Sequence, residues 1–417
     1  MEKTSIDKIS FYLLYLFIPS VIFSNALANS ILVVLSFLSC YLIFKKEVQI
    51  PSWLFYFLIL ILYYLFHPSN FIDQSVHLHY KEILKILFLI RFPLLIVLIL
   101  YLAKNQNNGR YFKLIFIIIA SLLFLLSIDI IFQFIFKIDF FGIKPGHWDE
   151  GIKDFKRYSG FFGDELIGGA YLYLNCPLFL YFLINKNYEK KRFFFLFLII
   201  LTFISTILSG ERVALFKLLL IFTIFAFFIL PDFKKQKYIL IIVFIFTAIF
   251  IYNNETLKKR YIQSTFTEIG SFEKIKKNSY HYLHYLTAIK IFKDNLFFGA
   301  GYKSFPDKCK KYDNDYDDKK NRKATSSCST HPHNIIFQIL SSGGLIGFLI
   351  FILFISQLIL FLLNSKNYLL IIYVLVFYLP IIPSGSVFTS WINFNFWLIL
   401  GLSLVYEKLK FNNKNLL

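Results

Sequence analysis

Long uninterrupted stretches of apolar residues restrict the fold of this chain more than any other feature. About twelve of them reach roughly 17 residues or more, the length that an α-helix needs to cross a bilayer. They cover residues 9–25, 29–44, 52–66, 83–103, 113–136, 164–185, 193–209, 213–230, 237–252, 334–363, 367–383 and 387–406. Only 17% of the residues are charged, below the roughly 25% typical of soluble domains. This pattern excludes an ordinary soluble enzyme and predicts an all-α, polytopic integral membrane protein.

The short connections between these stretches differ in charge, and the difference predicts an orientation. Lysines and arginines occur in alternate connections, whereas the connections at 24–29 and 384–390 contain none. Because basic loops stay in the cytoplasm, we expect both termini on the cytoplasmic side of a bacterial inner membrane. The first stretch lacks a convincing cleavage site, so we interpret it as a retained helix. The net charge of +19 lies between spans and does not indicate nucleic-acid binding.

Residues 253–333 differ from the rest of the chain in being as polar as a soluble protein. The predicted orientation places this segment in the periplasm. We therefore expect three parts. They are a membrane part over 1–252 with about nine spans, a periplasmic loop subdomain over 253–333, and the last three spans with a cytoplasmic tail over 334–417.

Every histidine and two of the four cysteines fall on the predicted outer side. Since the periplasm is oxidising, we predict a disulfide between Cys309 and Cys328, two free thiols being the alternative. Such a bond would close a loop of about 20 residues and stabilise the fold by about 3 kcal/mol. It would also hold the segment that contains His331 and His333.

His333 lies directly before a predicted span, in the sequence Cys-Ser-Thr-His-Pro-His-Asn that ends at Asn334. Pro332 opposes helix formation before this point, and Asn334 suits the N-cap of the span. His333 is therefore expected at the outer membrane surface. An imidazole there can act as a general base or bind an anion near neutral pH. The simpler alternative is a capped helix start with a histidine among the lipid headgroups.

Three arginines are candidates for binding a phosphate. Arg212 ends a short Ser-Gly-Glu-Arg turn, where it either binds a phosphate with both guanidinium nitrogens or extends to the headgroups. Arg157 precedes Asp164 and Glu165 at the start of another span, where the two acids also suit a helix N-terminus. Arg91 lies about 12 Å below the outer end of its span, a depth at which an unpaired charge is costly.

Two further histidines, His281 and His284, lie on a predicted short amphipathic helix that ends near a Gly-Ala-Gly turn. Their i, i+3 spacing suits a metal, but no paired cysteine or acidic third ligand lies beside them, so we predict no metal site. The chain also lacks the glycine-rich loops that bind nucleotides. A group-transfer enzyme at the outer face would therefore need a lipid-borne donor such as a polyprenyl pyrophosphate.

At these motifs the chain resembles the O-antigen ligase/polymerase superfamily of bacterial membrane glycosyltransferases. The resemblance spans most of the length. It includes the large loop between two late spans, the Ser-Gly-Glu-Arg turn, the Phe-Lys-Asp-Asn…Phe-Gly-Ala-Gly block, and His-Pro-His-Asn before Gly-Leu-Ile-Gly. It implies an all-helical fold and transfer of an undecaprenyl-pyrophosphate-linked glycan without a metal or other cofactor. It further implies that Arg212 and Arg157 bind the pyrophosphate and that His333 activates the acceptor.

Two positions depart from the family pattern. His281 stands where many members have a loop arginine, so either protonated His281 or Arg157 would supply that cation. Ser341-Ser342-Gly343 replaces a frequent Glu-x-Gly, so no carboxylate role transfers there.

The sequence hypothesis is an O-antigen ligase that transfers the glycan onto lipid A-core at the periplasmic face. The proposed catalytic residues are His333, Arg212 and Arg157, and the further substrate-binding candidates are Arg91, His331, His281, Asp164 and Glu165. A polymerase of the same superfamily, a protein O-glycosylation enzyme and a lipid-linked sugar flippase are the alternatives. Spans that are nearly uncharged in their middles, without visible repeats, argue against transport.

Overall fold

The computed structural model describes residues 3–70, 83–105, 108–147, 156–229, 234–312 and 327–412. Helices account for nearly all of its regular structure. The α-helices are α1 (Lys3–Phe23), α2 (Asn25–Phe44), α3 (Ser52–Leu65), α5 (Arg91–Leu102), α6 (Gly109–Phe136), α7 (Gly168–Asn175), α8 (Leu180–Ile184), α9 (Arg192–Leu208), α10 (Arg212–Ile224), α11 (Lys234–Asn253), α12 (Glu255–Lys258), α13 (Ser264–Ile269), α14 (Phe272–Asn278), α15 (Tyr280–Asp294), α16 (Phe305–Lys308), α17 (Ile335–Asn364), α18 (Tyr368–Phe377) and α19 (Ser390–Asn412).

Shorter elements connect or extend these helices. The 3₁₀ turns are η1 (Pro68–Asn70), η2 (Phe88–Ile90), η4 (Gly160–Phe162), η5 (Cys176–Phe179), η6 (Lys186–Lys191) and η9 (Cys309–Tyr312). Two π-helical turns are η7 (Phe225–Ile229) and η8 (Lys259–Gln263). The two-residue strands β1 (Gly146–His147) and β2 (Lys156–Arg157) form one antiparallel pair.

Six helices in the described part of the chain are long and apolar enough to cross a membrane. They are Ser5–Phe23, Asn25–Phe44, Ile83–Leu102, Gly109–Phe136, Tyr188–Leu208 and Ile335–Asn364. Five shorter apolar helices are Ser52–Leu65, Gly168–Ile184, Phe244–Asn253, Tyr368–Phe377 and Ser390–Tyr406. The predicted stretch at 213–230 forms α10 continued by η7. The helices confirm the predicted all-α, polytopic membrane class.

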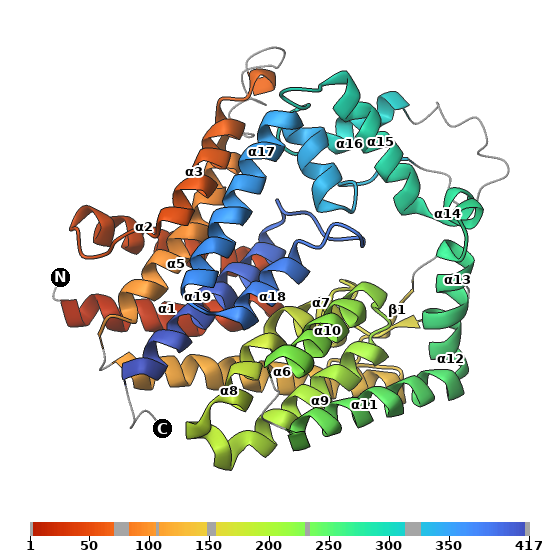
Figure 1. The fold of residues 1–417 in the computed structure, drawn as a ribbon, viewed down its shortest axis with the longest axis horizontal. Coiled ribbons are helices and arrows are strands. Elements are labelled where there is room, and N and C mark those ends of the chain that lie inside the picture. The colour runs from red at the N-terminus through yellow and green to blue at the C-terminus, as the bar shows by residue number, and fades with distance from the viewer. Residues whose placement is uncertain are drawn as a thin grey trace.

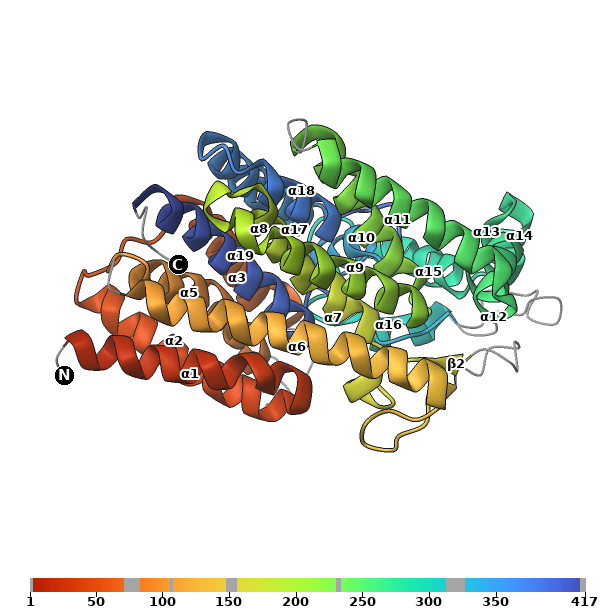
Figure 2. The same ribbon diagram turned by 90° about the horizontal axis from the view of Figure 1, so that it is seen from below.

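The helices pack side by side around a central one, α5. It lies between α2 and α19, and its residues from Leu95 to Ile99 are at most 1% exposed. A helix that is apolar on every side is suited to such an inner position, because each face meets another helix. Elsewhere in the bundle, α3 packs against α17 (Figure 1), and α6 packs against α9 and α1 (Figure 2).

The polar segment that follows α11 forms helices at one end of the bundle. Figure 1 shows α12, α13 and α14 running along one side of the molecule from the end of α11 to α15. From there α15 packs against α17. The start of α1 and the end of α19 lie at the opposite end of the molecule (Figure 1).

The Gly-Ala-Gly turn predicted after the amphipathic helix docks into a break in α17. The backbone of Gly344 leaves the helical conformation with φ 60° and ψ −161°. Beside it, the N–H groups of Ala300 and Gly301 donate to the carbonyls of Ser341 and Ser342, each at 2.9 Å. A Cβ on Gly299 would lie 2.4 Å from the backbone nitrogen of Gly344, so only glycine permits this approach. The break divides the predicted span at 334–363.

A disulfide joins Cys309, in η9, to Cys328, with 5.3 Å between their Cα atoms. It ties the end of the polar segment to the residues that lead into α17, five positions before His333. We expect the double variant Cys309→Ser/Cys328→Ser to lose about 3 kcal/mol of stability, because its unfolded chain is less restricted. Thermal unfolding in detergent would measure this loss. Alkylation of Cys309 and Cys328 in non-reduced protein would contradict the bond, and Cys40 and Cys176 serve as the free-thiol references.

Candidate active site

One large cavity joins residues from seven separate parts of the chain. Its volume is about 1840 Å³, larger than the roughly 300–1,000 Å³ of ordinary small-molecule pockets. Five cationic side chains and three carboxylates line it: Arg157, Lys217, Lys259, Arg260, Arg212, Glu165, Glu211 and Glu268. Four histidines complete the polar lining: His281, His284, His331 and His333. The excess of positive charge favours an anionic ligand.

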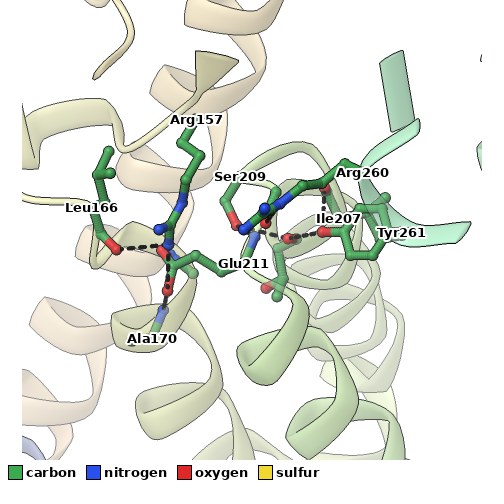
Figure 3. Close-up of polar contacts among 11 residues, drawn as sticks. Arg157, Leu166, Ala170, Ile207, Ser209, Glu211, Arg260 and Tyr261 are labelled. Carbon is green, nitrogen blue, oxygen red and sulfur yellow. Dashed lines mark hydrogen bonds and ion pairs between the residues drawn. The ribbon is translucent and has the colours of Figure 1, made fainter. Parts of the chain in front are cut away.

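Glu211 links two sides of this cavity. It is the N-cap of α10, and its side chain reaches across to the first turn of α7. Oε1 accepts the N–H of Gly169 at 2.7 Å, and Oε2 accepts the N–H of Ala170 at 3.1 Å (Figure 3). A carboxylate at a helix N-terminus satisfies free N–H donors and the helix dipole together. Burial raises the pKa of Glu211, while Arg157 and these two N–H groups oppose that rise.

Gly169 makes the approach of Glu211 possible. A Cβ at this position would lie 2.5 Å from Oγ of Ser209 and 3.1 Å from Cβ and Cδ of Glu211. We therefore expect Gly169→Ala to push Glu211 off the α7 N-terminus and to destabilise the protein by about 1–3 kcal/mol. Thermal unfolding in detergent measures this. The control Asp164→Asn alters an exposed acid before the same helix and should change stability by less than about 0.5 kcal/mol. Equal stability of Gly169→Ala and wild type would contradict the contact.

Three guanidinium groups surround the Ser209–Arg212 turn. Nη2 of Arg157 donates to the carbonyl of Leu166 at 3.1 Å and lies 3.9 Å from Oε2 of Glu211. Arg260 donates from Nε to the carbonyl of Gly210 at 3.0 Å, beside Tyr261, whose hydroxyl donates to Ile207 at 2.7 Å (Figure 3). These contacts hold both arginines at the end of α9.

Arg212 faces the polar segment rather than the carboxylate of its neighbour. Its Nη2 lies 2.7 Å from Oε2 of Glu268, and its Nη1 lies 3.3 Å from Oγ1 of Thr265. Burial and then the positive charges of Arg212 and Arg157 lower the pKa of Arg260 to about 10. The three guanidinium groups therefore lie near enough to one another to interact electrostatically.

The four histidines form a cluster next to the arginines. The ring centroid of His333 lies 4.1 Å from that of His331, 5.0 Å from that of His281 and 5.4 Å from that of His284. His333 has a left-handed backbone with φ 54°. Two hydrogen bonds keep it there. Its carbonyl accepts the N–H of Ser384 at 2.8 Å, and Oγ of Ser329 lies 3.0 Å from its Nε2.

Burial makes these imidazoles weak bases. It lowers the pKa of His281 to about 3 and that of His284 to about 4, with His333 adding repulsion in both cases. It lowers the pKa of His331 to about 3 and also lowers that of His333. These lowered pKa values favour the uncharged form of the rings at neutral pH.

Two of the residues proposed from sequence do not line the cavity. Arg91 is buried, donates from Nη2 to Oγ of Ser390 at 2.9 Å, and stacks among phenylalanines. It begins α5, which packs between α2 and α19, and it does not join the other arginines in the cavity lining. Asp164 is exposed and lies outside the cavity lining, whereas Glu165 lies within it.

Glu211, Arg260 and Lys217 also line the cavity, although the sequence patterns did not indicate them as site residues. Arg260 follows two lysines in the polar segment, a pattern that is typical of a solvent-exposed surface. Lys217 lies in an apolar stretch and is 2% exposed, where its Nζ donates to the carbonyl of Phe377 at 3.1 Å. A buried lysine in an apolar helix is a usable signal, since such a charge needs a partner. No such signal marked Glu211.

The fold and the cavity together define a polytopic membrane protein in which three arginines and a cluster of four histidines line one cavity. Residues 196–352 match the family model described as O-Antigen ligase. This match supports the resemblance to the O-antigen ligase/polymerase superfamily of bacterial membrane glycosyltransferases, whose members act in lipopolysaccharide biosynthesis. The matched stretch contains Arg212, Arg260 and the four clustered histidines. No protein of curated function matches the sequence.

Proposed function

We propose that this protein is an O-antigen ligase that transfers an undecaprenyl-pyrophosphate-linked glycan onto lipid A-core. The main support is that one cavity combines three arginines with the histidine cluster. Its volume of about 1840 Å³ leaves room for the end of a glycan donor and for an acceptor sugar. Its excess of positive charge suits both the pyrophosphate of the donor and the phosphorylated core of lipopolysaccharide.

In this proposal Arg157, Arg212 and Arg260 bind the donor pyrophosphate. Guanidinium groups suit this task because their paired N–H donors match phosphate oxygens. Arg212 exchanges its contact with Glu268 for a phosphate oxygen. The charge that develops on the leaving pyrophosphate then meets donors that are already in place, which lowers the barrier to transfer.

His333 acts as the general base. Its lowered pKa keeps the ring neutral, so that it can accept a proton from the acceptor hydroxyl. The resulting oxygen nucleophile attacks the anomeric carbon of the donor. A new glycosidic bond forms as the bond to the pyrophosphate oxygen breaks. Undecaprenyl pyrophosphate leaves with that electron pair, and the proton remains on His333 until it passes to water.

The location of this chemistry is part of the proposal. The positive-inside rule favours cytoplasmic termini and a periplasmic cavity. The arrangement of the chain supports it, because the start of α1 and the end of α19 lie opposite the end where α12–α15 gather (Figure 1). A membrane-impermeant maleimide tests this orientation. It would be applied to variants with a single cysteine placed in the 24–29 connection or in the tail after α19. Labelling of the tail in intact spheroplasts would contradict it.

A lipopolysaccharide gel from a deletion strain, with polyprenyl-linked glycan extracted in parallel, tests the reaction. The expected result is bare lipid A-core with long glycan retained on polyprenyl pyrophosphate, restored by the plasmid-borne wild type. Core that carries a single repeat unit would indicate a polymerase instead. Unchanged lipopolysaccharide would contradict both reactions and direct attention to glycoproteins or transport.

We expect chelation of metals to leave transfer intact, because in the proposed mechanism arginines, rather than a metal, stabilise the leaving group. Purified protein, lipid-linked donor and lipid A-core would be incubated with and without EDTA, and product measured on gels. A metal-dependent glycosyltransferase assayed in the same buffer shows that the chelator is effective. Strong inhibition of transfer would contradict a metal-independent mechanism.

A further inference from the structure

Three histidines that are remote in the sequence bring ring nitrogens together at one edge of the cavity. His281 and His284 lie one turn apart on α15, and His333 lies just before α17. One nitrogen from each ring lies within 4.8 Å of the others. We propose that these three imidazoles form a binding site for a divalent transition metal. Zinc is the ion that we expect to bind there.

The geometry requires only a small adjustment. Nitrogens bound to tetrahedral zinc at about 2.0–2.1 Å lie roughly 3.3 Å from one another. Closing the present separation needs rotations of the side chains, since the i, i+3 spacing already places His281 and His284 on one face of α15. Three protein nitrogens would leave a fourth position open, and the cavity that all three residues line adjoins it.

A second observation points to a ligand. Nδ1 of His281 and Nδ1 of His284 are buried and have no hydrogen-bond partner among the described residues. Buried polar atoms nearly always have a partner, so two such atoms in one cluster need an explanation. A metal ion would satisfy them. Oγ of Ser329, 3.0 Å from Nε2 of His333, provides the outer contact that usually orients a ligating ring.

The donor set selects the type of metal. The group consists of imidazoles alone and includes no carboxylate. Neutral imidazole nitrogens suit Zn²⁺, Ni²⁺ and Cu²⁺, whereas Mg²⁺ and Ca²⁺ prefer oxygen ligands. Zinc accepts three protein nitrogens with an open fourth position more readily than the others, because it has no preferred geometry of its own.

Occupancy of this site has a consequence that rests on the proposed function. The lone pair of His333 cannot both bind zinc and accept a proton from the acceptor. Zinc is therefore expected to inhibit transfer, which is compatible with a reaction that needs no metal. The site would make the activity sensitive to the zinc concentration outside the cytoplasm.

Titration of the purified full-length protein with ZnCl₂ against a chromogenic chelator tests binding without donor or acceptor. We expect one equivalent to bind, and His281→Ala and His284→Ala each to weaken binding at least tenfold. His331→Ala is the matched control. It removes a neighbouring imidazole outside the three-nitrogen group and should change affinity by less than threefold. Failure of the wild type to bind one equivalent, or equal affinity in all the variants, would overturn the proposal.

X-ray absorption on the zinc-loaded wild type tests the site without any substitution. Scattering from three histidine ligands is the expected result, and fewer than three would overturn it. Transfer assays then separate this site from the proposed function. Zinc should inhibit the wild type. In His284→Ala, the zinc concentration that halves the variant's own zinc-free rate should be at least tenfold higher. Stoichiometric zinc binding to the three histidines without inhibition would support the metal site and would contradict the base role of His333.

Discussion

His333→Asn is expected to lower the rate of glycan transfer by about 10²–10⁴-fold, the usual contribution of a positioned general base. Asparagine is a better replacement than alanine here. Position 333 has φ 54°, a left-handed conformation that asparagine tolerates better than alanine. The variant therefore removes the base with little added backbone strain. Transfer of glycan from lipid-linked donor to lipid A-core would be measured in membranes that contain equal amounts of each variant.

His331→Ala is the control for this experiment. The His331 ring lies 4.1 Å from that of His333, but its Nε2 is 3.3 Å from the carbonyl of Ser384. We expect its loss to be much smaller, below about tenfold, because it orients the segment and does not accept the proton. Equal losses in both variants would show that the cluster acts as a unit. A transfer rate near that of the wild type in His333→Asn would contradict the assignment of His333 as the general base.

The pH dependence gives a second check on His333. Burial lowers the pKa of this histidine below the ordinary value of about 6.5. The neutral, base-competent form then persists as the pH falls through 6.5, and activity is lost only at lower pH. The acid limb of kcat/KM should therefore lie below about 6.5. It should be absent from the residual activity of His333→Asn.

Arg212→Lys is expected to reduce transfer by about 10²–10³-fold, although it keeps the positive charge. The guanidinium of Arg212 engages Glu268 and Thr265 through separate nitrogens, 2.7 and 3.3 Å away. It can offer the same two donors to neighbouring phosphate oxygens, whereas a lysine ammonium is a single point charge. The loss should appear in kcat/KM for the lipid-linked donor. It would be measured with saturating acceptor.

Arg110→Lys is the matched control, because Arg110 is an exposed arginine on α6 that contacts Tyr111 and lies outside the cavity lining. It should transfer at the wild-type rate. A lysine variant at 212 that retains most of its activity would show that charge alone suffices. It would thereby contradict paired donation to the pyrophosphate.

Much of the fold is predictable from short-range patterns. The apolar stretches predicted the helices, and the histidine-containing helix before the Gly-Ala-Gly turn is confirmed as α15 (Tyr280–Asp294). Asn334 was predicted as an N-cap, and its Oδ1 accepts the N–H groups of Ile336 and Phe337. These features depend on residues within a few positions of one another. For this reason the sequence specifies them almost completely.

The acid at the start of α7 is a feature that short-range patterns do not predict. Asp164 and Glu165 are the nearest acids in the sequence and were the natural candidates for that helix N-terminus. The carboxylate that accepts its N–H groups instead comes from Glu211, 42 and 41 positions away from them. Gly169 leaves room for it, and no local pattern reveals that two distant segments pack so closely.

The histidine cluster shows the same division between local and long-range information. Spacing placed His281 and His284 on one helix face, but the third nitrogen comes from His333, about 50 positions later at the end of the polar segment. Helix positions and membrane class therefore follow from the sequence, since hydrophobicity is a local property. Which charges meet depends on helix packing over dozens of residues. That packing brings Arg260 to the cavity and leaves Arg91 among the phenylalanines of the core.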